Sequence, residues 1–296
     1  MPLYAHSLRT QDQNGAIVKI LFLSIPLLTA CTALPPTQIP HLDKAPFPHE
    51  ALDRVQQRFV DVQGRVDYRG LLQEPADLEL YYGLLAAYSP DSHPQFFPNR
   101  QSRLAYWINA YNAATLKAVL TYYPIGGVAE VEAPALLFFM PDKSGFFYFQ
   151  RPIFGGEKQS LYHLENDLIR PRFADPRIHF ALNCASRGCP TLPRRAFSAE
   201  NLDTELDRET RLFLSEQRNF RVDFAERAIY VSSLFDWYQE DYLQWLVAKG
   251  ETEPTVLDYI SRYLSMAKRN RLEQCEGCAL RFIPYDWQLN DQHPAD

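Results

Sequence analysis

The sequence has no apolar run long enough to cross a bilayer, which needs about 20 apolar residues. Its clearest apolar run, Ile20–Ala30, is roughly half that length. It also lacks a basic run interleaved with aromatic residues, so nucleic acid is not expected as a partner. No internal repeat occurs, and the only compositional bias is a proline-rich stretch near the start. These absences exclude a membrane-spanning role for the apolar run and a repeat architecture.

What is present predicts a large folded body. The 296 residues are 46% hydrophobic and 14% aromatic, and the net charge is −6. This composition is sufficient to bury a substantial core, in one domain or at most two.

Residues 1–30 are typical of an export signal. Arg9 and Lys19 precede the apolar run, which ends at Cys31. The last four residues, LTAC, resemble a bacterial lipobox, in which the cysteine is diacylated and becomes the mature N-terminus. The alternative is an ordinary signal peptide with a chance cysteine. We expect a lipid on Cys31 that holds the protein to a membrane, facing the periplasm. Since Thr32 rather than aspartate follows, the resemblance implies the outer membrane.

Residues 31–49 carry prolines at positions 35, 36, 40, 46 and 48. Because proline fixes φ and removes a backbone donor, this stretch is predicted to be an extended tether. The folded domain is then expected over residues 50–291.

The body is predicted to be a single α+β domain, with mixed helices around a small, mostly antiparallel sheet. Helical spacing of apolar residues and strand-like composition, read along the chain, give the expected elements. Helices are predicted at 51–60, 77–88, 102–122, 160–169, 199–214, 233–246 and 256–264, and strand segments at 146–154, 178–183 and 221–231.

Helix 102–122 is apolar almost all round, which predicts a central, buried helix. Asn109 and Asn112 lie on it three residues apart and are therefore neighbours on its surface. A buried amide without partners costs about 1–3 kcal/mol. We therefore expect both side chains to be hydrogen-bonded, either to the structure or to a functional group.

The stretch HFALNCASRGCP, residues 179–190, concentrates reactive side chains. On a regular strand His179 and Asn183 share one face, and Cys184 lies on the other. A His179–Cys184 dyad then requires the strand to end at Asn183, with the tight loop 185–188 redirecting Cys184. A nucleophilic Cys184 also requires a lowered pKa and a nearby base.

Four cysteines besides Cys31 form two close pairs, Cys184 with Cys189 and Cys275 with Cys278. In the periplasm a disulfide is the default for paired cysteines, and four cysteines allow three pairings. The alternatives are two local disulfides, two cross-links between the pairs, free or catalytic thiols, and a four-thiolate zinc site.

Two carboxylates are further candidates. Glu165 either forms an ion pair with Arg170 that holds its helix, which is the more ordinary interpretation, or acts in catalysis. Asp286 either orients a histidine or caps a turn, and the sequence favours neither.

Four segments resemble the domain-of-unknown-function family 547 (DUF547), in the same order and spacing. They are LAYWINAYNAATLKAVL (104–120), SLYHLENDLIRPRFADPRIHFALNCASRGCPTL (160–192), VSSLFDWYQEDY (231–242) and FIPYDWQLN (282–290). The resemblance covers roughly residues 50–290 and implies shared positions without an established reaction. Those positions are Trp107, Asn109, Asn112, Glu165, Arg170, His179, Asn183, Cys184, Ser186, Cys189, Pro190, Asp286, Trp287 and Asn290.

Two features depart from the family pattern. Asn166 stands where members often have histidine, and the C-terminal CEGC pair is not a general feature. The second departure disfavours a zinc site made by all four thiols and favours a local Cys275–Cys278 disulfide.

Together these residues predict an enzyme-like pocket with no cofactor and no metal. The candidate catalytic residues are Asn109, Glu165, His179, Asn183, Cys184 and Asp286. The expected chemistry is thiol-dependent hydrolysis or transfer at an amide, ester or thioester of a small or peptide-like envelope substrate. The alternative is a non-catalytic envelope binding or scaffold module with a structural Cys184–Cys189 disulfide. A thiol–disulfide carrier is disfavoured, because no C-x-x-C opens a helix after a strand.

Overall fold

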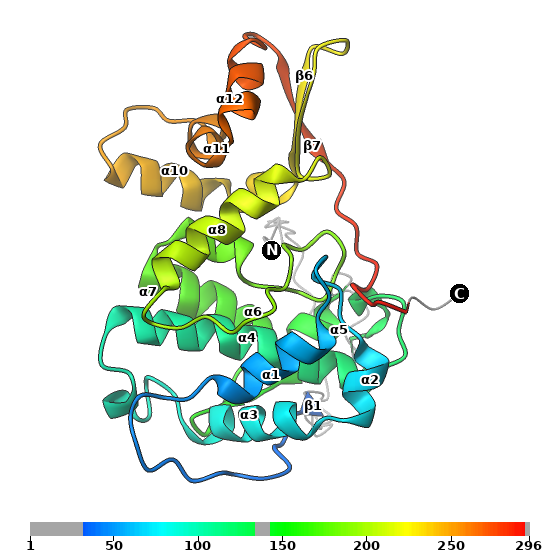
Figure 1. Ribbon diagram of the computed structural model, residues 1–296, viewed down its shortest axis with the longest axis vertical. Helices are drawn as coiled ribbons and strands as arrows, with labels where there is room; N and C mark the ends of the chain where they lie inside the picture. Colours follow the sequence, from blue (N-terminus) through cyan, green and yellow to red (C-terminus); the bar gives the residue numbers. More distant parts are fainter. Residues whose placement is uncertain (1–31, 134–142, 294–296) are drawn as a thin grey trace, which may run out of the picture.

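The computed structural model describes residues 32–133 and 143–293. It confirms an α+β fold: the helices form the body, and the three-stranded sheet lies at one end of the molecule (Figure 1). The predicted signal peptide and Cys31 lie outside the described residues.

The helical segments are α1 (Glu50–Phe59), α2 (Tyr68–Gln73), α3 (Ala76–Ala87), η1 (Pro94–Phe96), α4 (Arg100–Tyr122), η2 (Val128–Glu130), α5 (Ser144–Phe147), α6 (Leu161–His163), η4 (Leu164–Ile169), α7 (Arg170–Phe173), η5 (Pro176–Phe180), α8 (Leu202–Ser215), α9 (Leu234–Trp237), α10 (Gln239–Ala248), α11 (Val256–Tyr263) and α12 (Met266–Glu273).

Helix α4 is the central, buried helix that the sequence predicts. Asn99 caps it by accepting a hydrogen bond from the Ser102 backbone, and the Ser102 hydroxyl accepts one from Asn99 N–H in return. This reciprocal cap starts the helix at Arg100, two residues before the predicted start. Nearly every side chain from Ser102 to Val119 is buried, so neighbouring residues pack against α4 on all sides.

The helix predicted at 160–169 begins as expected, with Ser160 accepting a hydrogen bond from His163 N–H. It then widens into the π-helical segment η4 and continues through α7, so it ends four residues later than predicted. The π-helix is a rare conformation that frequently occurs at functional sites.

The strand predicted at 178–183 does not form. Asp175 caps the backbone of Arg177, and the fixed φ of Pro176 favours the short helix η5. Strand composition alone was misleading here, because no neighbouring strand is available to complete a ladder. The Asn112 side chain instead bonds the backbone, donating to Ala181 O at 3.0 Å and accepting from Asn183 N–H at 2.8 Å.

Three small sheets are present in the described residues. The hairpin predicted at 221–231 forms and gains a third, parallel strand. The segment predicted as one strand at 146–154 contains α5 followed by two very short strands. The sheets are β5 (Phe220–Asp223) with β6 (Ala228–Ser232) and β7 (Ala279–Ile283), β3 (Ile153–Phe154) with β4 (Glu157–Lys158), and β1 (Thr32–Ala33) with β2 (Gln150–Arg151).

The proline-rich segment packs against the body. Strand β1 pairs in parallel with β2, which lies far along the chain. Leu34 and Phe47 are buried, and the Tyr82 hydroxyl donates to Leu34 O at 2.6 Å. Residues 32–49 therefore form part of the folded body in addition to residues 50–291.

The apolar core divides into two clusters. One surrounds α4 and contains Tyr111 and Leu182, and the other joins α10 and α11 to the hairpin and contains Leu234 and Tyr238. The boundary between the two clusters positions the site, since side chains from both clusters meet there.

Candidate functional site

A narrow pocket lies between the two core clusters. Its free volume is 60 Å³, room for about four to six water molecules. Eight of its eighteen lining residues are Phe, Tyr or Trp, and a few polar groups converge in it, which is the usual character of a small-molecule site. The lining residues are Tyr111, Lys143, Ser144, Phe147, Tyr148, Tyr162, Glu165, Asn166, His179, Leu182, Cys184, Cys189, Pro190, Leu234, Trp237, Tyr238, Tyr285 and Trp287.

Glu165 enters this pocket from the π-helical segment η4. The hydroxyl of Tyr238 donates to its Oε1 at 2.5 Å, and the hydroxyl of Tyr111 donates to its Oε2 at 3.3 Å. Burial, followed by the nearby charge of Glu165, raises the pKa of both tyrosines well above the usual value, so both remain donors. The two phenols hold Glu165 in place. The expected Glu165–Arg170 pair does not form, because Arg170 bonds a different carboxylate.

That carboxylate is Asp241, which also bonds His179. Arg170 binds it through Nε at 2.7 Å and Nη2 at 2.9 Å, and His179 Nε2 lies 2.7 Å from Asp241 Oδ2. Burial alone would raise the pKa of Asp241, but the hydrogen bonds from His179 and Arg170 outweigh burial and hold it well below its usual value. The carboxylate is therefore ionised, and it accepts the Nε2–H of His179.

His179 is itself held neutral. Burial lowers its pKa, and the neighbouring Asp241 only partly opposes that effect. Its ring stacks on Tyr238, with centroids 3.8 Å apart and planes 18° apart. A neutral imidazole with its proton on Nε2 is thus fixed in one orientation at the back of the pocket.

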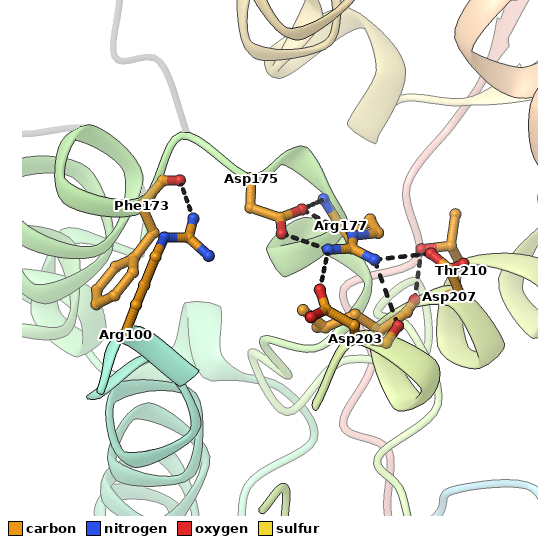
Figure 2. Close-up of polar contacts among 8 residues, drawn as sticks. Arg100, Phe173, Asp175, Arg177, Asp203, Asp207 and Thr210 are labelled. Atoms are coloured by element: carbon orange, nitrogen blue, oxygen red, sulfur yellow. Dashed lines mark hydrogen bonds and ion pairs between the residues drawn. The ribbon is translucent and has the colours of Figure 1, made fainter. Parts of the chain in front are cut away.

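The short helix that carries His179 is anchored by Arg177, as Figure 2 shows. Arg177 bonds Asp175 through Nε and Nη2 and reaches Asp203 and Asp207 of α8 at 2.8 Å each. Only 14% of the Arg177 side chain is exposed. One arginine thereby ties η5 to α8 and limits the movement of the histidine.

The loop after Asn183 is closed by a Cys184–Cys189 disulfide, and both cysteines line the pocket. Ala185 adopts a left-handed φ of 63°, which turns the chain sharply at this point. The turn realises the tight loop that the sequence predicts after Asn183. Cys275 and Cys278 form the second disulfide, so the pairing is local in both cases.

The disulfide loop is fixed against the C-terminal segment. Gly188 N–H donates to Asp286 O at 2.8 Å, and Arg187 N–H donates to Gln288 O at 2.8 Å. A Cβ on Gly188 would lie 2.9 Å from Asp286 N and from the Tyr285 ring, so only glycine allows this approach. The Tyr285 hydroxyl lies 3.1 Å from the sulfur atoms of both cysteines of the loop.

The predicted asparagines belong to the scaffold. Asn109 accepts from Phe197 N–H at 3.0 Å and donates to Phe197 O at 2.8 Å, away from the pocket. Asn183 donates to Pro190 O at 2.8 Å and accepts from Ala185 N–H at 2.9 Å, which closes the loop. Their amides replace backbone partners in irregular segments, which explains why polar groups are retained in the core.

Asp286 does not orient the histidine. It is exposed, and its Oδ1 accepts a hydrogen bond from Gln288 N–H, so it caps a turn. Asp241 takes the orienting position instead. Of the six candidates, the structure brings together Glu165, His179 and Cys184 in the pocket, and it places Asn109, Asn183 and Asp286 outside its lining.

The sequence-based reasoning missed Asp241 and most of the aromatic wall. The available signal was the segment VSSLFDWYQEDY, which contains Trp237, Tyr238 and Asp241 within five positions. A carboxylate one helical turn after an aromatic residue is common on surfaces, so only the long-range contact with His179 reveals its role.

Residues 95–214 match the family described as "Protein of unknown function, DUF547". The match supports the resemblance to that family over this part of the chain. It includes Glu165, His179 and the Cys184–Cys189 loop, whereas Asp241 and Tyr285 lie beyond it. Comparison with curated proteins and with solved structures found no match.

Within residues 32–133 and 143–293, no helix has the length and apolar character required to cross a membrane. The same ranges hold no cluster of three or more histidine, cysteine, aspartate or glutamate side chains suited to a metal ion.

Proposed function

We propose that this protein is a non-catalytic cell-envelope module whose pocket binds a small ligand. The observation that supports this proposal is that the pocket is rigidly built while both of its cysteines are bonded to each other. A cysteine in a disulfide has no thiolate to act as a nucleophile. Aromatic walls with a few convergent polar groups are typical of a site that binds a small molecule.

The second candidate is the thiol-dependent hydrolase or transferase. One observation favours it: Cys184 lines the same pocket as His179 and Glu165. This activity requires the Cys184–Cys189 bond to be reduced first, so it belongs to a different redox form of the protein.

We further propose that a lipid on Cys31 attaches the protein to the outer membrane, with the domain in the periplasm. The lipobox-like LTAC sequence supports this, and disulfides suit an oxidising compartment. The mass of the N-terminal peptide from mature protein tests it, with Cys31→Ser as the control. A diacylglyceryl mass on Cys31 that is absent from the variant is expected, and an unmodified cysteine contradicts the proposal.

A pair of cysteine variants separates the two functions. Cys189→Ser leaves Cys184 as a permanent free thiol, and Cys184→Ser is the matched control with the same bond removed. For a binding module we expect neither variant to hydrolyse p-nitrophenyl acetate or a thioester reporter above the free-cysteine rate. Turnover by Cys189→Ser that Cys184→Ser lacks would overturn the binding proposal and support the enzyme.

Ligand binding is tested directly on the oxidised, mature protein. Trp237 and Trp287 lie in the pocket wall, so occupancy changes tryptophan fluorescence. Fractions of a small-molecule envelope extract are titrated against wild type and against Leu182→Trp, which fills the pocket. A saturable change in wild type that the filled variant lacks is expected, and the absence of any saturable response contradicts the proposal.

A further inference from the structure

Among the described residues, the pocket lining contains two formally charged side chains, and they have opposite signs. Glu165 comes from η4, and Lys143 immediately precedes α5. His179, the other titratable nitrogen in the wall, is neutral because burial lowers its pKa. The site therefore offers one negative and one positive charge to a ligand.

These two charges do not neutralise each other. The described contacts of Glu165 are with Tyr111 and Tyr238, and Lys143 is not among its partners. The Lys143 ammonium instead lies over the Trp287 ring, 4.1 Å from its centroid. Among the described residues, the Lys143 ammonium group has no hydrogen-bond partner. Its three N–H donors are therefore not bonded to any described carboxylate.

Glu165 also retains capacity for a ligand. An ionised carboxylate offers about four lone-pair positions. Tyr238 and Tyr111 occupy one position on each oxygen. Because both phenols are held by burial, the carboxylate is fixed in orientation while still able to accept hydrogen bonds from an ammonium group.

The size of the pocket limits the ligand. A free volume of 60 Å³ corresponds to about four to six water-sized atoms. The main chain of an α-amino acid has about five heavy atoms, which is the same size. Aromatic walls, including the stacked rings of Tyr148 and Tyr162 at 4.2 Å, suit the carbon atoms between the two charged ends.

We propose that the pocket binds a small α-amino acid as a zwitterion, with its ammonium group on Glu165 and its carboxylate on Lys143. This rests on the proposed binding function and names its ligand class. In a pocket of this kind a charged ligand group is tolerated only when it is paired, and each end of the zwitterion meets the opposite charge. A simple amine or a simple acid would leave one protein charge unused.

The test is isothermal titration of oxidised, mature protein with glycine, L-alanine and D-alanine. N-acetylalanine removes the ammonium group, and alaninamide removes the carboxylate. We expect each modified compound to bind at least about tenfold more weakly than the best parent amino acid, as expected for loss of a charge-assisted hydrogen bond.

Two variants assign the contacts. Glu165→Gln should abolish the preference for alanine over N-acetylalanine. Lys143→Met should abolish the preference for alanine over alaninamide. Glu157→Gln and Lys158→Met alter an exposed pair on β4 and should change neither preference.

Equal affinity for the modified compounds, or no binding of any amino acid, would overturn the inference. The fluorescence titration with envelope extract shows whether only the amino-acid assignment fails or the proposed binding function fails as well. If an extract fraction still binds in the Leu182-dependent manner, only the amino-acid assignment is wrong. If no fraction binds, the proposed binding function is wrong as well.

Discussion

His179 and Asp241 are 62 positions apart in the sequence and are joined by a 2.7 Å hydrogen bond at the back of the pocket. Arg170 holds the same carboxylate from the other side. This arrangement means that the position of the histidine depends on α10, a helix outside the range that matches the family.

The first prediction compares two aspartates. Asp241→Asn should lower the free energy of unfolding by about 2–3 kcal/mol, because it weakens three charge-assisted hydrogen bonds and leaves Arg170 without its counter-ion. Asp286→Asn should change it by less than about 0.5 kcal/mol, since an amide oxygen still accepts from Gln288. Urea denaturation at pH 7 measures both, and equal effects of the two variants would contradict the arrangement.

The second prediction concerns pH and His49. Its Nδ1 lies 2.8 Å from the Tyr81 hydroxyl and 3.1 Å from the Asn109 amide nitrogen, so it accepts from both. Burial lowers the pKa of His49 to about 4, with Glu200 partly opposing the shift. The folded state therefore binds this proton more weakly than the unfolded state, whose histidine pKa is about 6.5.

This contribution to stability is complete above pH 6.5 and is lost as the pH falls towards 4. The loss from His49 amounts to at most about 3 kcal/mol. His49→Gln, which keeps an acceptor without titrating, should reduce the slope of the stability profile between pH 6.5 and 4, and the buried His179 supplies part of the slope that remains. His41→Gln, at an exposed histidine, should leave the profile unchanged. A wild-type slope in both variants would show that His49 is not responsible.

The third prediction concerns the proline-rich segment. Phe47 is 4% exposed and packs against Tyr106 and Phe97, whereas Ile39 in the same segment is 70% exposed. Phe47→Ala should therefore cost about 3–5 kcal/mol. Ile39→Ala should have little effect. Thermal and urea unfolding of the full chain measure the difference, and a neutral Phe47→Ala would indicate a free tether.

The fourth prediction concerns the arginine beneath His179. Arg177→Gln leaves three aspartates close together without their shared cation, so we expect a loss of about 2–3 kcal/mol. Arg172→Gln breaks an ion pair with Asp91 that is about half exposed, and it should cost less than about 1 kcal/mol. High salt should reduce the Arg172 effect more than the Arg177 effect. If the two variants are equally mild, Arg177 does not anchor η5.

The features that the sequence predicted are those governed by local chemistry. Helix α4 has continuous apolar spacing and a polar cap, and both signals are contained in its own residues. The tight loop at Ala185 agrees with the small residues Ala185, Ser186 and Gly188 between the two cysteines. Helix α12 was not predicted because it has no buried residue and therefore no apolar periodicity.

The features that failed depend on contacts between distant segments. The composition of residues 178–183 suits a strand, but Asn112 on α4 supplies the backbone partners that a neighbouring strand would otherwise provide. Likewise, Asp241 and Asp286 are both carboxylates near aromatic residues in the sequence. Only the fold determines which of them reaches His179.

The pairing of β1 with β2 limits how far the protein can reach. A free chain over residues 32–49 would extend about 60 Å from its anchor. Because Thr32 is already held beside Gln150, a lipid on the preceding residue would keep the domain against the bilayer surface. Helix α5, which supplies Ser144 and Phe147 to the pocket, ends only three positions before β2. The protein would then bind ligands in the thin layer next to the membrane and would not reach ligands farther out in the periplasm.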